Sequence, residues 1–344
     1  MKNTMVETVN GPIEISKLGV TLMHEHLLID IPYSWHKPTE ASRLALAKAP
    51  VNPEIIGELK CDPYINLDNI RMSDIDVATY EVMKFKELGG QTIVDATSRY
   101  NGRDPLALKA IAQRTGLNIV MGGGYFMEKS LPEKVKDMSI EDAKEEVIKE
   151  VTIGVDGSGI KVGIIGEAGV GINMTDIELK LLRAQSRAQA ATNVPLTIHT
   201  YGWGKPCNKI IDIAAEEGAN LKMVILDHMN PSGHDLKYQV SLLERGVFLE
   251  YDMIGMDYYY PGEGQSPSDE ENAKAIKGLI DAGYINQILL SQDVFLKMML
   301  TKYGGNGYGY ILKHFVPRLK RLGVNDQQIY TLLVKNPQRV FIGK

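Results

Sequence analysis

Length, composition and charge narrow the possible functions of this chain before any motif is considered. Its 344 residues suit a (β/α)8 barrel with insertions, so we expect one domain over residues 1–344. The formal net charge of -5, without a block of Lys or Arg, argues against a nucleic-acid partner. We find no apolar run long enough to span a membrane, no signal peptide and only two cysteines, and therefore expect a cytoplasmic protein.

The chain is predicted to begin with a β-hairpin and to continue as alternating strands and helices. Residues 6–15 contain the turn signal Asn10-Gly11-Pro12 between two short strand-like runs. The strands predicted after this hairpin are 20–29, 92–96, 118–123, 162–167, 196–199, 223–227, 247–251 and 287–291. The helices predicted are 74–88, 105–115, 140–151, 175–191, 207–217, 236–244, 269–282, 310–322 and a last one at 326–334, ending near Asn336-Pro337. This repeated β/α pattern predicts an α/β protein with a closed parallel TIM barrel.

One stretch interrupts the alternation. Residues 32–69 form a long, irregular stretch that begins with Pro32 and holds further prolines at positions 38, 50, 53 and 63. We interpret this stretch as an insertion after the first strand that lies over the catalytic face of the barrel.

Histidines and acids gather at the ends of the predicted strands. His24 and His26 are two residues apart in the first strand, so their side chains share a face. The ends of strands 4, 5, 6 and 8 add Glu167, His199, His228 and Asp293. Four imidazoles and two carboxylates suit one or two divalent ions such as zinc, manganese or cobalt.

A structural role is the alternative for each of these residues taken singly, since a lone strand histidine is more often a hydrogen-bonded core residue. The coincidence favours ligands: four of the seven histidines stand at strand ends, whereas His36, His234 and His314 fall in loop or helix patterns. A buried carboxylate such as Glu167 without a cation would cost several kcal/mol. We interpret Asp95 and Asp227 as groups that support the ligands or cap helices.

Several segments resemble the phosphotriesterase-like branch of the amidohydrolase superfamily. They are residues 21–27 (TLMHEHL), 163–167 (GIIGE), 197–200 (TIHT), 227–228 (DH), 291–293 (SQD) and 303–308 (YGGNGY). Within that branch, residues 154–161 (GVDGSGIK) before the Glu167 strand are most similar to the phosphotriesterase-related and phosphotriesterase homology proteins. The resemblance implies a binuclear metal centre with His24, His26 and Asp293 on the more buried ion, and His199 and His228 on the more exposed one.

The chain departs from the organophosphate-degrading and lactonase relatives at the end of strand 4. Those relatives bridge their metals with a carboxylated lysine there, whereas the nearest lysine in this chain, Lys161, lies six residues before Glu167. At about 3.3 Å per residue it would lie about 20 Å lower in the barrel, so Glu167 is expected to be the bridge. An efficient phosphotriesterase is therefore less expected.

The mechanism expected from this centre is hydrolysis by a metal-bridging hydroxide. Two cations lower the pKa of a shared water and polarise the substrate carbonyl. Asp293 is expected to orient the hydroxide, accept its proton and pass it to the leaving group.

Candidate substrate contacts follow several strands. Tyr125 follows strand 3, where lactonase relatives place a tyrosine beside the metals, and Tyr303 adds aromatic surface after strand 8. Arg99, Lys205 and Lys297 are candidate partners for an anionic substrate group. Because residues 294–297 (VFLK) are mostly apolar, they weaken the case for a phosphorylated sugar lactone.

Three hypotheses remain open. The first is a metal-dependent hydrolase of a small lactone or carboxylic ester, and the second is an amidase of a small N-acyl amino compound with the same centre. The third, a barrel that binds metal or ligand without turnover, is disfavoured because all six ligand positions are present. We expect a homodimer with two divalent ions per chain, most simply zinc, and a small-molecule substrate.

Overall fold

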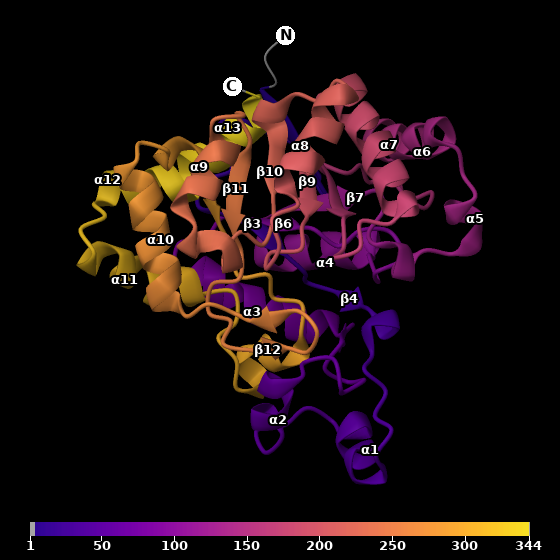
Figure 1. Cartoon of the computed structure of the whole chain (residues 1–344), viewed down its shortest axis with the longest axis vertical. Coiled ribbons are helices and arrows are strands. Elements are labelled where there is room, and N and C mark those ends of the chain that lie inside the picture. The colour runs from indigo at the N-terminus through magenta and orange to yellow at the C-terminus, as the bar shows by residue number, and fades with distance from the viewer. Residues whose placement is uncertain (1–3, 344) are drawn as a thin grey trace.

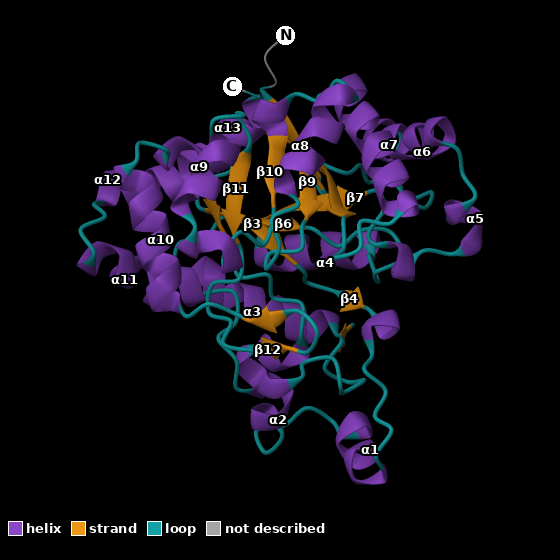
Figure 2. Ribbon diagram, in the orientation of Figure 1, coloured by secondary structure: helices purple, strands orange, loops and turns teal. Residues whose placement is uncertain are grey.

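The centre of the molecule is an eight-stranded parallel sheet that curls into a nearly closed barrel (Figure 2). The structure, a computed structural model, describes residues 4–343. The strands, in chain order, are β3 (Thr21–Glu25), β6 (Thr92–Asp95), β7 (Asn118–Gly123), β8 (Ile164–Gly169), β9 (Leu196–His199), β10 (Val224–Leu226), β11 (Phe248–Tyr251) and β14 (Ile288–Leu290). Each strand pairs with the next in that order. At the seam between β3 and β14, His24 N donates to Ser291 Oγ at 3.0 Å. The predicted TIM barrel is confirmed.

Helices cover the outside of the barrel. They are α3 (Ile75–Glu87), α4 (Pro105–Thr115), α6 (Ile140–Thr152), α7 (Asp176–Thr192), α8 (Cys207–Glu216), α9 (Leu236–Leu243), α10 (Asp269–Asp281) and α11 (Val316–Arg321). Their starts follow local capping chemistry: Thr175 and Glu178, for example, form a reciprocal capping box at the start of α7. Six of these helices, all but α8 and α11, begin where a side chain accepts from a free backbone N–H group.

The C-terminal helical region extends further than the sequence indicates. The prediction of a helix ending at residue 334 was wrong, because α12 (Asp326–Tyr330) continues through a π-helical turn (Thr331–Lys335) into α13 (Asn336–Ile342). Pro337 is tolerated because it stands in the first turn of α13, and the wider π-helical turn before it absorbs the change of hydrogen-bond pattern.

The predicted N-terminal hairpin is present and closes one end of the barrel. β1 (Met5–Thr8) and β2 (Gly11–Glu14) pair antiparallel, and Val9 N donates to Ile119 O of β7 at 2.9 Å. Apolar side chains of the hairpin region and of α13 meet those that point inward from the strands. This barrel plug consists of Val6, Ile15, Leu18, Met23, Val94, Val120, Ile164, Ile225, Phe248, Leu289, Val340 and Phe341.

The insertion after the first strand lies at the opposite end. β4 (Ile29–Asp30) precedes it, α1 (Ala41–Lys48) and α2 (Ile56–Cys61) lie within it, and β5 (Arg71–Met72) follows it and pairs with β4. Figure 1 shows α1 and α2 projecting from the end of the molecule that is far from both chain termini. The short hairpin β12 (Tyr259–Tyr260) and β13 (Gly264–Gln265) lies at the same end.

Within residues 4–343, no helix combines the length and the apolar character that crossing a membrane requires.

Candidate metal centre

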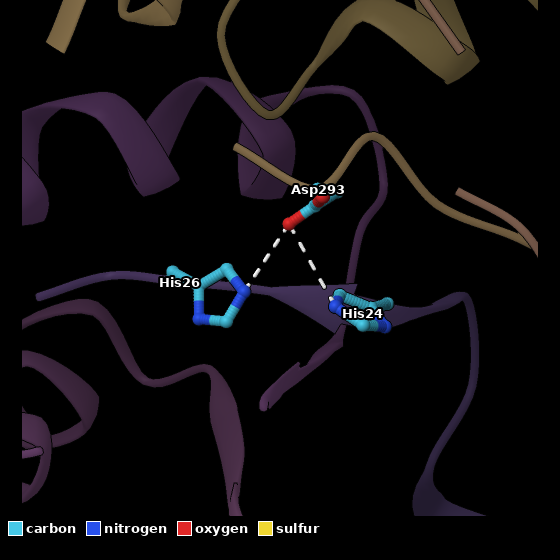
Figure 3. Close-up of side chains that lie close together, drawn as sticks. All are labelled: His24, His26 and Asp293. Carbon is cyan, nitrogen blue, oxygen red and sulfur yellow. Dashed lines mark ion pairs between the residues drawn. The ribbon is translucent and has the colours of Figure 1, made fainter. Parts of the chain in front are cut away.

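Three of the predicted ligands meet at the carboxyl ends of the first and last strands of the barrel (Figure 3). Asp293 Oδ1 lies 3.2 Å from His26 Nε2 and 3.7 Å from His24 Nε2. His24 lies in β3 and His26 directly follows its last residue, and the two side chains point to the same side, as expected for residues two apart in an extended chain. All three side chains are buried.

The other three predicted ligands form an adjoining cluster. Glu167 Oε2 lies 2.9 Å from His199 Nδ1 and 3.6 Å from His228 Nε2. The same carboxylate faces the first cluster, because Glu167 Oε1 is 3.8 Å from His26 Nε2 and Oε2 is 3.7 Å from His24 Nε2. Glu167 thus stands between the two groups, where a bridging carboxylate would have to be.

Neighbouring side chains orient two of the imidazoles. His26 Nδ1 is 2.9 Å from Thr97 Oγ1, whose hydroxyl donates to Leu28 O at 3.2 Å, so Thr97 accepts from the ring and leaves His26 Nε2 free as a ligand. His228 Nδ1 is 3.0 Å from Asp252 Oδ1, which fixes His228 in the same sense. These supporting roles of Thr97 and Asp252 were not predicted from the sequence. The available signal was that Thr97 and Asp252 lie just beyond predicted strands.

Two of the six residues hold unusual backbone conformations. His228 and Asp293 have φ values of 59° and 48°, in the left-handed region that favours glycine. The Asp252 carboxylate accepts from His228 N at 2.9 Å, and His24 O accepts from Asp293 N at 3.2 Å. These bonds hold both residues in a conformation that aims their side chains at the centre.

Glu25, between His24 and His26, holds the segment after β14 that carries Asp293. Its carboxylate accepts from Ser291 Oγ at 2.8 Å, Gln292 N at 2.9 Å and Val294 N at 2.9 Å. Burial raises the pKa of Glu25 to about 7 despite these hydrogen bonds. The middle residue of the His24-Glu25-His26 run therefore positions the aspartate from behind.

The neighbouring histidines lower the pKa values of the two carboxylates of the centre. Burial acts to raise the pKa of Glu167, but the charge of His24 and the hydrogen bonds of His199 and His228 outweigh it and hold that pKa well below its usual range. Burial likewise acts to raise the pKa of Asp293, and His26 and His24 lower it overall. Both carboxylates are therefore ionised and able to bind cations.

The unpaired atoms of the centre fit divalent ions. Asp293 Oδ1 and both ring nitrogens of His24 are buried without a hydrogen-bond partner among the described residues. Buried polar atoms of this kind are uncommon unless something else satisfies them. With the two groups His24, His26, Asp293 and Glu167, His199, His228, the donors are consistent with a binuclear metal site.

A cavity of about 510 Å³ opens over this centre. Its inner surface includes His26, Glu167, His199, His228 and Asp293, and much of its wall is apolar or aromatic: Ile29, Ile31, Tyr33, Tyr64, Phe126, Ile172, Trp203, Met253, Met256, Tyr260 and Phe295. The insertion contributes Tyr33, Ser34 and Tyr64, so it does lie over the face that carries the ligands.

Comparison with known proteins agrees with this geometry. Residues 4–341, almost the whole chain, match the sequence description of the phosphotriesterase family. The chain belongs to the phosphotriesterase family. The resemblance noted in the sequence is thereby confirmed, and this phosphotriesterase-family chain is a metal-dependent hydrolase.

The relatives of this hydrolase are named for different activities or ligands. The chain is 34% identical to an N-acetyltaurine hydrolase of Dictyostelium discoideum, over 97% of each chain. A crystal structure of a resiniferatoxin-binding protein from Rhodobacter sphaeroides is 48% identical, with a TM-score of 0.98 over 99% of this chain and 95% of that one. A lactonase from Listeria monocytogenes is 26% identical, with a TM-score of 0.79 over 99% of both chains.

The five predicted substrate contacts do not line the cavity of this phosphotriesterase-family hydrolase. Tyr125 is fully buried and donates to Glu146 Oε2 at 2.7 Å. Arg99 pairs with Glu150 at 2.8 Å and also contacts Glu146. The remaining three are held outside the cavity: Lys205 by Asp235, Lys297 by Asp68, and Tyr303 between Lys297 and Lys302.

Intramolecular charge pairing explains this difference. A loop cation that follows a strand appears free in the sequence, but Arg99, Lys205 and Lys297 each have an acidic partner from a distant segment. The cations that do line the cavity are Lys129 and Lys136, in the loop and short helix after β7.

Proposed function

We propose that this chain hydrolyses the amide bond of a small N-acyl amino compound with the help of two divalent ions. The observation that carries the proposal is the position of Glu167, whose carboxylate faces His26 on one side and His199 and His228 on the other. His24, His26 and Asp293 would hold one ion, His199 and His228 the other, and Glu167 both. Similarity over the whole chain to N-acetyltaurine hydrolases supports an amide substrate.

Bound divalent ions would polarise the scissile carbonyl and lower the pKa of an attacking water. Asp293 supplies the proton handling: because its pKa is lowered, its carboxylate is ionised at neutral pH and accepts a proton from the attacking water. An amine leaves an amide only after protonation of its nitrogen, so Asp293 then donates this proton to the leaving group. Apolar walls formed by Phe126, Met253 and Phe295 surround this centre and would limit its contact with bulk water once a substrate fills the cavity.

A lactone or carboxylic ester is the second candidate, and it was the first choice from the sequence. The Listeria monocytogenes lactonase supports it, since that enzyme shares the fold over 99% of both chains. The apolar cavity would accept an uncharged ring. Both candidates use the same metal ligands and the same proton handler.

Turnover by metal-replete protein separates the two candidates. A panel of N-acyl amino acids and N-acyl taurines would be compared with a panel of γ-lactones after loading with zinc, manganese or cobalt. We expect kcat/KM for the best amide to exceed that for the best lactone by at least about tenfold. The reverse order would favour the lactone, and no turnover of either class with two ions bound would contradict hydrolysis of both.

We also propose zinc as the natural metal, at two ions per chain, and a homodimer as the assembly. The imidazole and carboxylate donors support zinc, although manganese or cobalt would suit them too. Metal analysis of protein purified without chelator tests the first statement, and light scattering coupled to gel filtration tests the second. The cytoplasmic location stays a prediction from the sequence.

A further inference from the structure

One cation of the cavity wall has no acidic partner. Lys129 lies in the 3-10 turn Glu128–Ser130 after β7 and lines the cavity, and in the described part of the chain its ammonium forms no ion pair. Lys136 lines the same cavity, but it is paired with Glu133 at 2.7 Å. The charge of Lys129 is therefore available to a ligand.

An aromatic ring holds this ammonium in place. Lys129 Nζ lies 5.6 Å from the centre of the Tyr33 ring, within the range of a cation–π contact. The Tyr33 hydroxyl donates to Asn101 Oδ1 at 2.8 Å, and Asn101 is itself buried and bonded to Ser98. The ring is thus fixed from behind, with Lys129 on its cavity side.

Tyr33 also connects this cation to the metal centre. Burial, and next to it the negative charge of Glu167, raise the pKa of Tyr33 well above its usual value, so the ring stands within the field of the proposed bridging carboxylate. Tyr33, Lys129 and the metal ligands therefore line the same cavity.

No acid of the described residues forms an ion pair with the exposed Lys129, although Glu178 and Glu263 line the same cavity. Glu178 is buried, and its carboxylate accepts from the backbone N–H groups of Glu128, Gly171 and Thr175. Burial lowers the pKa of Lys129, and the charges of Glu263 and Glu178 oppose this effect only in part. An anionic ligand would supply the missing counter-charge.

We propose that Lys129, seated on Tyr33, binds the carboxylate or sulfonate of the amino part of an N-acyl substrate whose acyl group is larger than acetyl. The inference rests on the proposed amide hydrolysis and names the substrate class of that site. A charge-assisted contact of Lys129 selects the anionic head. The apolar remainder of the cavity receives the acyl group, since its volume of about 510 Å³ lies in the range of pockets for drug-sized ligands.

Binding without turnover tests the anionic contact directly. Metal-replete Asp293→Asn protein would be titrated by calorimetry with N-phenylacetylglycine, N-phenylacetyltaurine and the neutral N-phenylacetylglycinamide. We expect the better anion to bind about tenfold to hundredfold more tightly than the neutral amide. In the Asp293→Asn background, a second substitution Lys129→Met should abolish this preference, whereas Lys129→Arg in its place should keep much of it. Lys136→Met in the same background should leave the preference unchanged.

Three results would overturn the proposal: a preference that survives Lys129→Met, equal losses in the Lys129→Met and Lys136→Met proteins, or no detectable binding of any of the three compounds. The order of the glycine and taurine conjugates identifies the head group. If N-acetylglycine binds as tightly as N-phenylacetylglycine, the statement on acyl size is wrong.

Kinetics separate this inference from the proposed function. In protein with Asp293 intact, Lys129→Met should raise KM for the anionic amide about tenfold or more and change kcat little, because the contact is equally strong in the ground and transition states. If the compounds bind through Lys129 but are not hydrolysed, the proposed function fails while the binding site stands.

Discussion

In the proposed mechanism, Asp293 both binds a metal ion and transfers a proton. Its Oδ1 faces His24 and His26, and its Oδ2 lies 4.0 Å from His228 Nδ1. Its left-handed backbone and the bonds that Glu25 makes to Ser291, Gln292 and Val294 hold it there. These contacts fix the orientation of the Asp293 carboxylate. A carboxylate held in this way could bind a metal ion and also exchange a proton with a correctly placed group.

Replacing Asp293 with asparagine separates these two roles. The amide keeps an oxygen that can approach a metal but cannot accept the proton, so we expect kcat to fall by about 10² or more. Metal content by mass spectrometry and the far-ultraviolet circular dichroism spectrum should stay close to wild type. Turnover close to that of the wild type would show that another acid handles the proton.

The metal affinity of the centre should depend on pH. Burial acts to lower the pKa values of His24, His26 and His228, but neighbouring carboxylates outweigh it and raise all three. In the metal-free site these imidazoles therefore hold their protons to a higher pH than a free imidazole does, and a metal ion must displace them. Affinity for zinc should therefore rise as the pH is raised, with proton release on binding. Calorimetry in two buffers of different ionisation enthalpy would measure it, and equal apparent enthalpies in both buffers would rule out the proton release.

The residues of the site were predictable to different degrees. His24, His26, Glu167, His199 and Asp293 end apolar runs, and the structure brings them together as the strand-end argument requires; their metal binding stays a prediction. The cation at the cavity wall was not predictable in this way. Whether a lysine is free depends on distant acids such as Asp68 and Asp235, which the sequence does not place.

At the scale of elements, helix α3 secures the segment that follows β14. Glu81 of α3 is fully buried and accepts from Thr301 N at 3.0 Å, Thr301 Oγ1 at 2.8 Å and Lys302 N at 2.9 Å. The 3.6-residue periodicity of apolar residues predicts the buried face of α3. It does not predict an acidic side chain on that face. The acid is needed because the backbone of residues 301–302 turns inward there and has no other described acceptor.

Removal of this acid should destabilise the fold. Glu81→Ala leaves two backbone N–H groups and a hydroxyl without their acceptor, and we expect a loss of roughly 2–4 kcal/mol in the free energy of unfolding. Glu87→Ala, at an exposed position of the same helix, is the matched control and should change stability by less than about 0.5 kcal/mol. Urea denaturation followed by circular dichroism measures both, and equal values would show that the Glu81 bonds contribute nothing.

The boundaries of elements were less predictable than their existence. The eight strands and the hairpin follow from apolar runs and turn signals, whereas the end of the last helix does not. Asn336-Pro337 is a common stop signal, and it failed because Asn336 is buried and donates to Ile285 O and Ile288 O at 2.7 Å each. A tertiary contact of this kind cannot be read from local sequence.

At the scale of the whole molecule, one end of the barrel contributes mainly to stability, and the other end carries the proposed site. The barrel plug is apolar and lies at one end, while the metal ligands and the cavity lie at the other. Changes at the plug should therefore alter stability more than activity.

Phe341→Ala tests this division. The side chain is only 2% exposed, so its removal leaves a cavity in the plug, and we expect a loss of about 3–5 kcal/mol. At temperatures well below the melting point, KM for the best substrate should be unchanged. Tyr330→Ala, at an exposed position of α12, serves as the control, and a large change of KM in Phe341→Ala protein would show that the two ends communicate.

The plug also joins the beginning of the described chain to its end. α13 packs on the segment after the N-terminal hairpin, and Gln338 Nε2 donates to Ser16 O at 3.5 Å. Figure 1 shows both termini at the face opposite to α1 and α2. A circular permutant that links the old ends by a short flexible peptide, and opens the chain between the exposed residues Thr39 and Glu40, should therefore fold to the same barrel. A fluorescent protein fused at either natural end should likewise leave the substrate entrance clear, so that turnover and fluorescence can be recorded from one molecule.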